Sequence, residues 1–189
     1  MKLVFLTPGT GSYYCGVCMR DNALAKELIR MGHDAVMLPM YLPLSLDETA
    51  AGGKDQEIFY GGINVYLQQK FPIFRRTPRF VDRWLDASGL LKWVAKFSGM
   101  TGGTEIGELT YSMLIGEEGN QVKELDRLIE FLRAERPDAV WLSTALLEGL
   151  ARRIRQDVGV AVFCSLQGED SFLDTLAEPW RTRCWEALA

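Results

Sequence analysis

Three short stretches of this chain, residues 7–16, 143–144 and 167–170, together supply glycines and hydroxyl, amide and carboxylate side chains, which are groups that orient small ligands in binding sites. Each stretch follows an apolar run typical of a buried strand. Because ligands bind beyond the carboxyl ends of the strands in a doubly wound sheet, we expect the three stretches to line one cleft. The candidate substrate-binding residues are Gly9, Thr10, Gly11, Gly16, Asn22, Ser143, Thr144, Gln167 and Gly168.

Glu169 and Asp170 are adjacent carboxylates in the third stretch and are the candidate catalytic residues. One such carboxylate can orient a sugar hydroxyl or stabilise an oxocarbenium-like charge during glycosyl transfer. Asp170 also has a structural interpretation, because an aspartate before Ser171 can cap a helical turn. The sequence leaves both interpretations open.

Gly9 and Gly11 do not complete a dinucleotide-binding fingerprint. That motif requires a third glycine at position 14, where this chain has Tyr14, and no Gly-Lys-Ser/Thr phosphate loop is present. A tight turn between a strand and a helix explains these glycines, and such a turn can also hold a phosphate or a sugar. The sequence therefore predicts a glycine loop without identifying its ligand.

Cys15 and Cys18 form a Cys-x-x-Cys pair, which at a helix N-terminus can lower a thiol pKa and support disulfide exchange. The pair follows the first predicted strand directly and lacks the proline that thioredoxins have between the cysteines. We interpret the thiols as buried or incidental, with redox activity and metal binding as the alternatives. Zinc needs two further ligands, and Cys164, Cys184 and His33 lack paired spacing, so we expect no metal site.

The first forty residues predict one strand–loop–helix–strand unit. Residues 3–6 and 35–38 are apolar runs that suit strands buried on both faces. Four apolar side chains between these runs recur at helical spacing. We expect Asp21 and Asn22 to cap the start of this helix, and Gly32 to end it.

The rest of the chain continues the alternation of helices and strands, which predicts an α/β fold. We expect a Rossmann-like, doubly wound and mostly parallel sheet with helices on both faces, formed by residues 1–189 as a single domain. The fold would include an inserted β-hairpin and a helical insertion within residues 70–120. The later predicted elements are helices at 105–115, after 120, at 146–154 and at 178–189, and strands at 138–143 and 160–164.

Residues 57–60 and 63–67 are two largely apolar stretches on either side of Gly61 and Gly62, which predicts a β-hairpin with a two-residue turn. In that register Tyr60 faces Ile63, and Ile58 faces Val65. One side of the hairpin would then be apolar and buried.

Residues 70–97 differ in composition from the rest of the chain. They carry a net charge of +5 in a protein of net charge −4, and aromatic residues are interleaved with the basic ones. This asymmetry indicates an anionic partner, either a membrane surface or an anionic acceptor. In the alternative interpretation the aromatic residues cover the sheet while the basic groups point to water.

The composition restricts the function classes further. A net charge of −4 argues against a general nucleic-acid-binding protein, since no overall positive field attracts phosphates. No apolar run approaches the roughly 18 residues of a membrane span, and four cysteines do not form a disulfide scaffold. We expect a cytoplasmic protein, located either free in the cytoplasm or peripherally at the inner face of the membrane.

Together these features resemble the amino-terminal half of two-domain glycosyltransferases of the glycogen-synthase and glycosyltransferase family four kind. The motifs that carry the resemblance are Leu28-Ile-Arg-Met-Gly-His-Asp-Ala35, Gly62-Ile-Asn-Val-Tyr66 followed by Phe71-Pro-Ile-Phe-Arg75, Pro137-Asp-Ala-Val140, and Val160-Ala-Val-Phe163 leading to Gln167-Gly-Glu-Asp170. Two positions depart from the family pattern: Ala35 replaces a valine, and Gln167 replaces a histidine. A glutamine can donate a hydrogen bond to a sugar, but it cannot shuttle a proton.

The resemblance implies two Rossmann-like domains of GT-B type that face each other. The amino-terminal domain would bind the acceptor, which is a glycan, a lipid or a small molecule, and its glycine loop would touch the donor diphosphate. The missing carboxyl-terminal domain would hold the nucleotide sugar, which acts as a co-substrate, so no tightly bound cofactor is expected. The chain ends within the predicted helix 178–189, and we expect a fragment without turnover.

Two other function classes remain open at this stage. The first is a thiol-disulfide oxidoreductase that uses Cys15 and Cys18. The second is a non-enzymatic α/β binding module.

Overall fold

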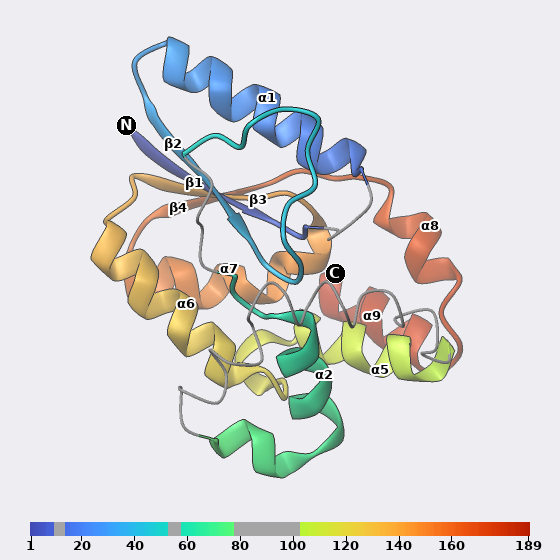
Figure 1. Cartoon of the computed structure of the whole chain (residues 1–189). Coiled ribbons are helices and arrows are strands. Elements are labelled where there is room, and N and C mark those ends of the chain that lie inside the picture. Colours follow the sequence, from blue (N-terminus) through green and yellow to red (C-terminus); the bar gives the residue numbers. More distant parts are fainter. Residues whose placement is uncertain (10–13, 53–57, 78–102) are drawn as a thin grey trace.

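The computed structural model describes residues 1–9, 14–52, 58–77 and 103–189. Its centre is a four-stranded sheet in the order β2-β1-β3-β4, and every pair of neighbouring strands is parallel. The strands are β1 (Lys2–Thr7), β2 (Asp34–Pro39), β3 (Ala139–Leu142) and β4 (Ala161–Cys164). The expectation of a Rossmann-like α/β fold with a parallel sheet is confirmed (Figure 1).

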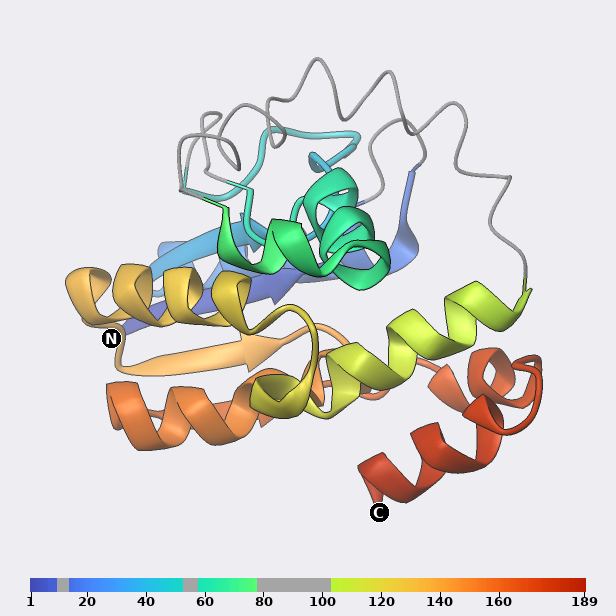
Figure 2. The same cartoon turned by 90° about the horizontal axis from the view of Figure 1, so that it is seen from below.

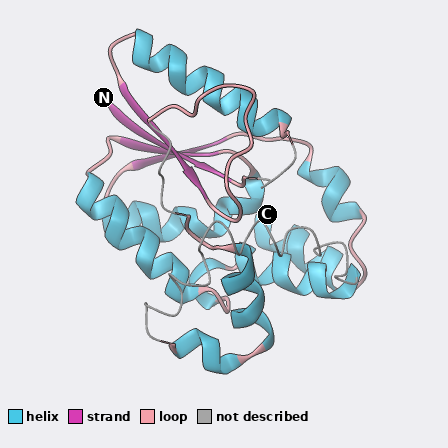
Figure 3. Ribbon diagram, viewed as in Figure 1, coloured by secondary structure: helices cyan, strands magenta, loops and turns pink. Residues whose placement is uncertain are grey.

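The helices lie on both faces of this sheet and beyond one end of it (Figures 2 and 3). Residues 145–158 form one continuous helical stretch that begins as a 3-10 helix and ends in a π turn. The helical elements are α1 (Gly16–Arg30), α2 (Gly62–Lys70), η1 (Pro72–Arg76), α5 (Gly103–Leu114), η3 (Gly116–Glu118), α6 (Val122–Glu135), η4 (Ala145–Leu150), α7 (Ala151–Arg153), η5 (Ile154–Val158), α8 (Glu169–Asp174) and α9 (Trp180–Leu188).

Alternate side chains of the strands point to two separate apolar cores, as expected for strands covered on both faces. Val4 and Leu6 of β1 belong to the core that includes the buried leucines of α6. Phe5 belongs to the opposite core, where it lies with Ala25 of α1 and Met37 of β2. The sheet is therefore doubly wound, with α1 on one face and α6 on the other.

The first strand–helix–strand unit forms at the predicted residues, but its helix starts earlier than expected. Helix α1 begins at Gly16, and Cys15 is its N-cap. Asp21 and Asn22 therefore lie inside the helix, and the prediction that they cap its start is wrong. Gly32 follows the helix with a φ of 87°, the left-handed conformation that glycine adopts readily.

The predicted β-hairpin at 57–67 is wrong for its described part, because Gly62–Lys70 forms helix α2. Tyr60 has a φ of 55°, and the chain enters the helix through Gly61 instead of a two-residue turn. Asn64 and Gln68, one helical turn apart, donate hydrogen bonds of 2.7 and 3.1 Å to the buried carboxylate of Glu124 on α6. These contacts hold α2 against α6 and explain why the segment is helical.

Only part of the basic, aromatic segment 70–97 falls within the described residues, because residues 78–102 lie outside them. Its described part is helical, and Lys70 forms an ion pair with Glu105 at 2.6 Å. Arg75 donates a 2.8 Å hydrogen bond to the carbonyl of Gln68 near the end of α2. Phe71 and Ile73 are 53% and 73% exposed. The described part of the segment thus offers apolar side chains to solvent, while Lys70 and Arg75 are engaged within the protein.

An aromatic row crosses the sheet on the face that α1 covers only in part. Phe5, Trp141 and Phe163 occupy paired positions on β1, β3 and β4, and successive rings stack with centroids 5.8 Å apart. Phe5 is buried, whereas Phe163 is 49% exposed.

In the described part of the chain, no helix has both the length and the apolar character needed to cross a lipid bilayer.

Candidate functional site

The order of the strands creates a topological switch point between β1 and β3. The chain runs from β1 to β2 on one side and then returns to β3 and β4 on the other side of β1. At such a point the loops that leave the two central strands diverge, and ligands of open α/β sheets bind there. The residues at this position are Thr7, which ends β1, and Ser143, which follows β3.

A buried hydrogen-bond network joins these two strand ends to α1. The hydroxyls of Thr7 and Ser143 are 3.0 Å apart, and the Ser143 hydroxyl donates a short hydrogen bond to Oδ2 of Asp21. Oδ1 of Asp21 accepts from Nε and Nη2 of Arg20, at 3.0 and 2.5 Å. Thr7, Asp21 and Ser143 are fully buried, whereas the Arg20 side chain is 42% exposed. The switch point therefore has a buried carboxylate beneath an exposed guanidinium.

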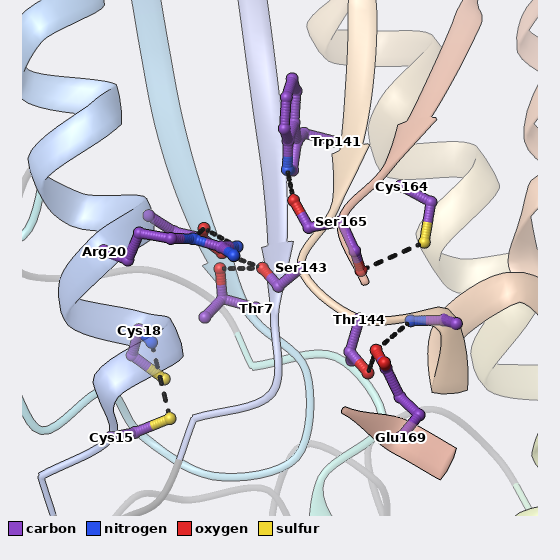
Figure 4. Close-up of polar contacts among 12 residues, drawn as sticks. Thr7, Cys15, Cys18, Arg20, Trp141, Ser143, Thr144, Cys164, Ser165 and Glu169 are labelled. Atoms are coloured by element: carbon purple, nitrogen blue, oxygen red, sulfur yellow. Dashed lines mark hydrogen bonds and ion pairs between the residues drawn. The ribbon is translucent and has the colours of Figure 1, made fainter. Parts of the chain in front are cut away.

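A second connection ties the loop after β3 to the start of α8. Oε1 of Glu169 accepts hydrogen bonds from the Thr144 hydroxyl at 2.6 Å and from the Ala145 N–H at 2.8 Å (Figure 4). Oε2 accepts from the Gln167 N–H at 2.6 Å. Burial raises the pKa of Glu169, but the hydrogen bonds from Thr144 and the backbone outweigh it and hold the pKa below the ordinary value. Glu169 is thus charged at neutral pH, and both of its oxygens are engaged by donors.

Glu169 therefore has a clear structural role beside its predicted catalytic one. Its contacts fix the loops after β3 and β4 against each other. Asp170, the second catalytic candidate, is exposed on the first turn of α8. The N-cap of α8 is Gly168, with a φ of 80°, so Asp170 does not cap this helix.

The glycines of the first loop differ in their surroundings. Gly9 has a φ of 71°, and a Cβ there would lie 1.8 Å from the carbonyl oxygen of Leu42. Its lack of a side chain is therefore required by the close approach of residues 42–43. Gly16 starts α1, and a Cβ there would meet no atom within 4 Å. The candidates Thr10 and Gly11 lie outside the described residues.

Asn22 contacts the loop after β2. Its Nδ2 donates to the carbonyl of Thr49 at 3.3 Å, and its Oδ1 accepts from the N–H of Ala51 at 2.8 Å. The side chain is buried with both ends of its amide engaged. Asn22 thus anchors this loop to α1.

Gln167 lies in the loop between β4 and α8, at the same edge of the sheet as Ser143 and Thr144. Its side-chain Nε2 is enclosed and has no hydrogen-bond partner among the described residues. An amide donor without a partner is available to an acceptor atom in this loop region.

The cysteine pair lies at the N-terminus of α1. Sγ of Cys15 accepts a weak hydrogen bond from the Cys18 N–H at 3.5 Å, and neither residue forms a disulfide (Figure 4). Burial, reinforced by Cys15, raises the pKa of the Cys18 thiol to about 12. Cys18 is therefore a neutral thiol at physiological pH. Within the described ranges, no group of three or more His, Cys, Asp or Glu residues is placed to hold a metal ion.

Three residues of the switch point were not among the sequence candidates: Thr7, Arg20 and Asp21. Thr7 directly follows the first apolar run, so its position at a strand end was a usable signal. Arg20 and Asp21 were hidden by the misplaced start of the helix. Once α1 begins at Gly16, these two residues fall in its early turns, beside the strand ends.

Comparison of the chain with protein-family models, with curated proteins and with solved structures finds no match.

Proposed function

We propose that this chain is the acceptor-side, amino-terminal half of a nucleotide-sugar-dependent glycosyltransferase. The observation that carries the proposal is that the end of β1, the loop after β3 and the start of α8 meet at one edge of the sheet. The end of β1 meets the loop after β3 through Thr7 and Ser143, and the loop after β3 meets the start of α8 through Thr144 and Glu169. A sugar nucleotide bound at this edge can contact all three of these segments at once.

In the proposed reaction, the acceptor hydroxyl bonds to the anomeric carbon of the donor sugar, and the bond from that carbon to the diphosphate breaks. The acceptor proton leaves, and the nucleoside diphosphate is the second product. Positive charge develops at the anomeric carbon in the transition state. Both oxygens of Glu169 already accept hydrogen bonds, so Glu169 is not assigned as a base or a nucleophile. Its negative charge instead supports the reaction by attracting the positive charge at the anomeric carbon. Gln167 offers its free amide N–H to a sugar oxygen.

The proposal includes a second, carboxyl-terminal domain that holds the nucleotide sugar, so the 189-residue chain alone would bind ligands without turnover. It also includes a cytoplasmic location. The exposed Phe71 and Ile73 would contact the membrane or an anionic acceptor together with the rest of residues 70–97.

The first test is ligand binding by the 189-residue chain. Isotope-labelled protein is titrated with UDP-, GDP- and ADP-linked sugars, and the backbone amide resonances are followed. We expect at least one ligand to shift the amide resonances of Ser143, Thr144 and Gln167, while the amide resonances of α9 stay unchanged. Shifts confined to other regions of the chain would contradict the proposed site.

The second test is turnover by the protein expressed from its complete reading frame. The assay measures release of nucleoside diphosphate from each donor in the presence of glycan, lipid and small-molecule acceptors. Release that depends on an acceptor supports the glycosyltransferase. Binding by the chain with no turnover of any donor would favour a non-enzymatic binding module.

The alternative of a thiol-disulfide oxidoreductase gains no support from the geometry. Cys18 is fully buried, and its pKa is raised to about 12, so it is not the attacking thiolate at neutral pH, and any disulfide exchange would have to begin at the half-buried Cys15. The direct measurement is insulin reduction by the chain in the presence of dithiothreitol, in which we expect no rate above that of dithiothreitol alone.

A further inference from the structure

Arg20 occupies an unusual position for an exposed arginine near the start of a helix. Consecutive residues on a helix point in directions that differ by about 100° and do not normally face each other. Here the Arg20 side chain nevertheless pairs with the adjacent Asp21 through both Nε and Nη2. In Figure 4 it extends from α1 toward Thr7 and Ser143 at the strand ends. The pairing therefore turns Arg20 toward the switch point.

Asp21 is itself fixed by the sheet. Its side chain has no exposed surface, and its second oxygen accepts the hydrogen bond from Ser143. Ser143 is in turn held by Thr7 at 3.0 Å. The orientation of Arg20 is thus set by residues of β1, of α1 and of the loop after β3.

The remaining donors of Arg20 are available to a ligand. Asp21 is the partner of Arg20 among the described residues, and it engages only Nε and one N–H of Nη2, which leaves the other guanidinium N–H groups. The Arg20 side chain is 42% exposed. The first turn of α1 contains no acidic residue, so the positive end of its dipole is not offset there. Both features favour an anion at this place.

We propose that Arg20 binds a phosphate group of the ligand at the switch point and that Asp21 is its positioning residue. A guanidinium presents parallel N–H groups that match the geometry of phosphate oxygens. The inference rests on the proposed function for the source of the phosphate, which is either the diphosphate of a nucleotide sugar or a phosphorylated acceptor. It assigns Arg20 and Asp21, which the sequence motifs did not identify.

The test measures phosphate binding by the 189-residue chain, using inorganic pyrophosphate as the probe for the donor and glucose 6-phosphate as the probe for the acceptor. Amide shifts detected by NMR report affinity even in the millimolar range. We expect Arg20→Ala to weaken binding of at least one probe by about tenfold, equal to about 1.4 kcal/mol. The affinity of Arg20→Lys should lie between those of the wild type and of Arg20→Ala, because lysine keeps the charge but loses the planar fork.

Arg30→Ala is the matched control, since Arg30 lies on the same helix and pairs with an exposed acid, Glu27. It removes the same charge at the far end of α1, and it should leave the affinity unchanged. Equal losses in Arg20→Ala and Arg30→Ala would mean a general charge effect and would overturn the proposal.

Asp21→Asn separates positioning from simple charge. If Arg20 acted only as a point charge, removal of the neighbouring negative charge would strengthen anion binding. If Asp21 orients Arg20, the variant should bind the probe several-fold more weakly, although it has lost a negative charge. Circular dichroism and the melting temperature establish that the variant is folded, and Ser143→Ala provides a second way to loosen Asp21.

The outcomes also separate this inference from the proposed function. Pyrophosphate or sugar-phosphate binding through Arg20, without turnover of any nucleotide sugar by the complete protein, would support the phosphate site and contradict the proposed glycosyltransferase. Turnover with unchanged kcat and KM in Arg20→Ala would support the proposed glycosyltransferase and contradict the phosphate site. Absence of binding for both probes overturns the inference.

Discussion

The hydroxyl of Ser143 donates a hydrogen bond to the fully buried carboxylate of Asp21, which lies 122 positions earlier in the chain. This contact joins α1 to the end of β3 at the switch point of the sheet. A buried carboxylate needs donors that replace its lost hydration. Asp21 obtains them from Ser143 and Arg20, so these residues determine both the stability of this edge and the charge that it presents.

Ser143→Ala removes one of these donors without removing the carboxylate. We expect the free energy of unfolding to fall by about 1–3 kcal/mol, the usual cost of leaving a buried polar group without its partner. Urea denaturation at neutral pH measures this change. Ser171→Ala is the control, because Ser171 is exposed on α8, and its effect should stay within about 0.5 kcal/mol. Equal effects of the two variants would show that Asp21 does not depend on Ser143.

Glu169→Gln replaces the carboxylate that holds Thr144, Ala145 and Gln167 by an amide. One amide nitrogen must then face an N–H or hydroxyl donor, so we expect a loss of about 1.5–3 kcal/mol at pH 7. The folded-state pKa of Glu169 lies below its ordinary value of 4.5. Its contribution is therefore present above that value and disappears as the pH falls through the lowered pKa.

The stability difference between wild type and Glu169→Gln should accordingly shrink below about pH 4.5. Asp170→Asn is the matched control, since Asp170 is the exposed neighbour on the same helix. A difference that stays constant from pH 7 to pH 3 would contradict the charged, hydrogen-bonded state of Glu169.

Gly9→Ala and Gly16→Ala test which glycine of the first loop is structurally required. At Gly9 the backbone is left-handed, and the new Cβ would collide with the Leu42 carbonyl, so we expect a loss of about 2 kcal/mol or more. At Gly16 the Cβ meets nothing, and alanine should raise the stability by about 0.4–1 kcal/mol. Thermal melting compares the two, and similar melting temperatures would show that residues 42–43 move aside easily.

Cys18→Ala tests the neutral state of the buried thiol. The pKa of Cys18 in the folded protein is raised from 9.0 to about 12, so between these values the unfolded chain loses the thiol proton while the folded protein keeps it. Stability is therefore retained below pH 9 and falls as the pH rises above it. The alanine variant lacks this term, and its stability should decline less between pH 9 and 11 in urea titrations. Parallel declines would indicate that Cys18 ionises within the folded protein.

Much of the fold follows from local patterns in the sequence. The apolar runs at residues 3–6, 35–38 and 139–142 are strands, because consecutive apolar residues are typical of strands in a parallel sheet that is covered on both faces. The amphipathic pattern after Asn120 is likewise a helix, with Leu125, Ile129 and Leu132 buried on one stripe. The alternation of these elements was sufficient to predict the parallel sheet, and with it the shared edge on which the three polar loops lie.

Other features depended on contacts between distant residues. The polarity of residues 58–67 suits a strand as well as a helix. The helix forms because Asn64 and Gln68, spaced one turn apart, both reach Glu124 on α6. In the same way, nothing in the local sequence distinguishes Asp21 from a capping residue until Cys15 takes the N-cap position of α1.

The sequence by itself determined which residues form the sheet and which loops leave its carboxyl edge, because the positions of the strands depend on hydrophobic periodicity over short distances. The tertiary structure decided what each polar residue at that edge does. It paired Asp21 with Ser143, engaged Glu169 with the loop after β3, and turned Arg20 toward the strand ends. Asp21 and Glu169 keep their buried positions because folding brings them the hydroxyls of Ser143 and Thr144, which lie 122 and 25 positions away along the chain.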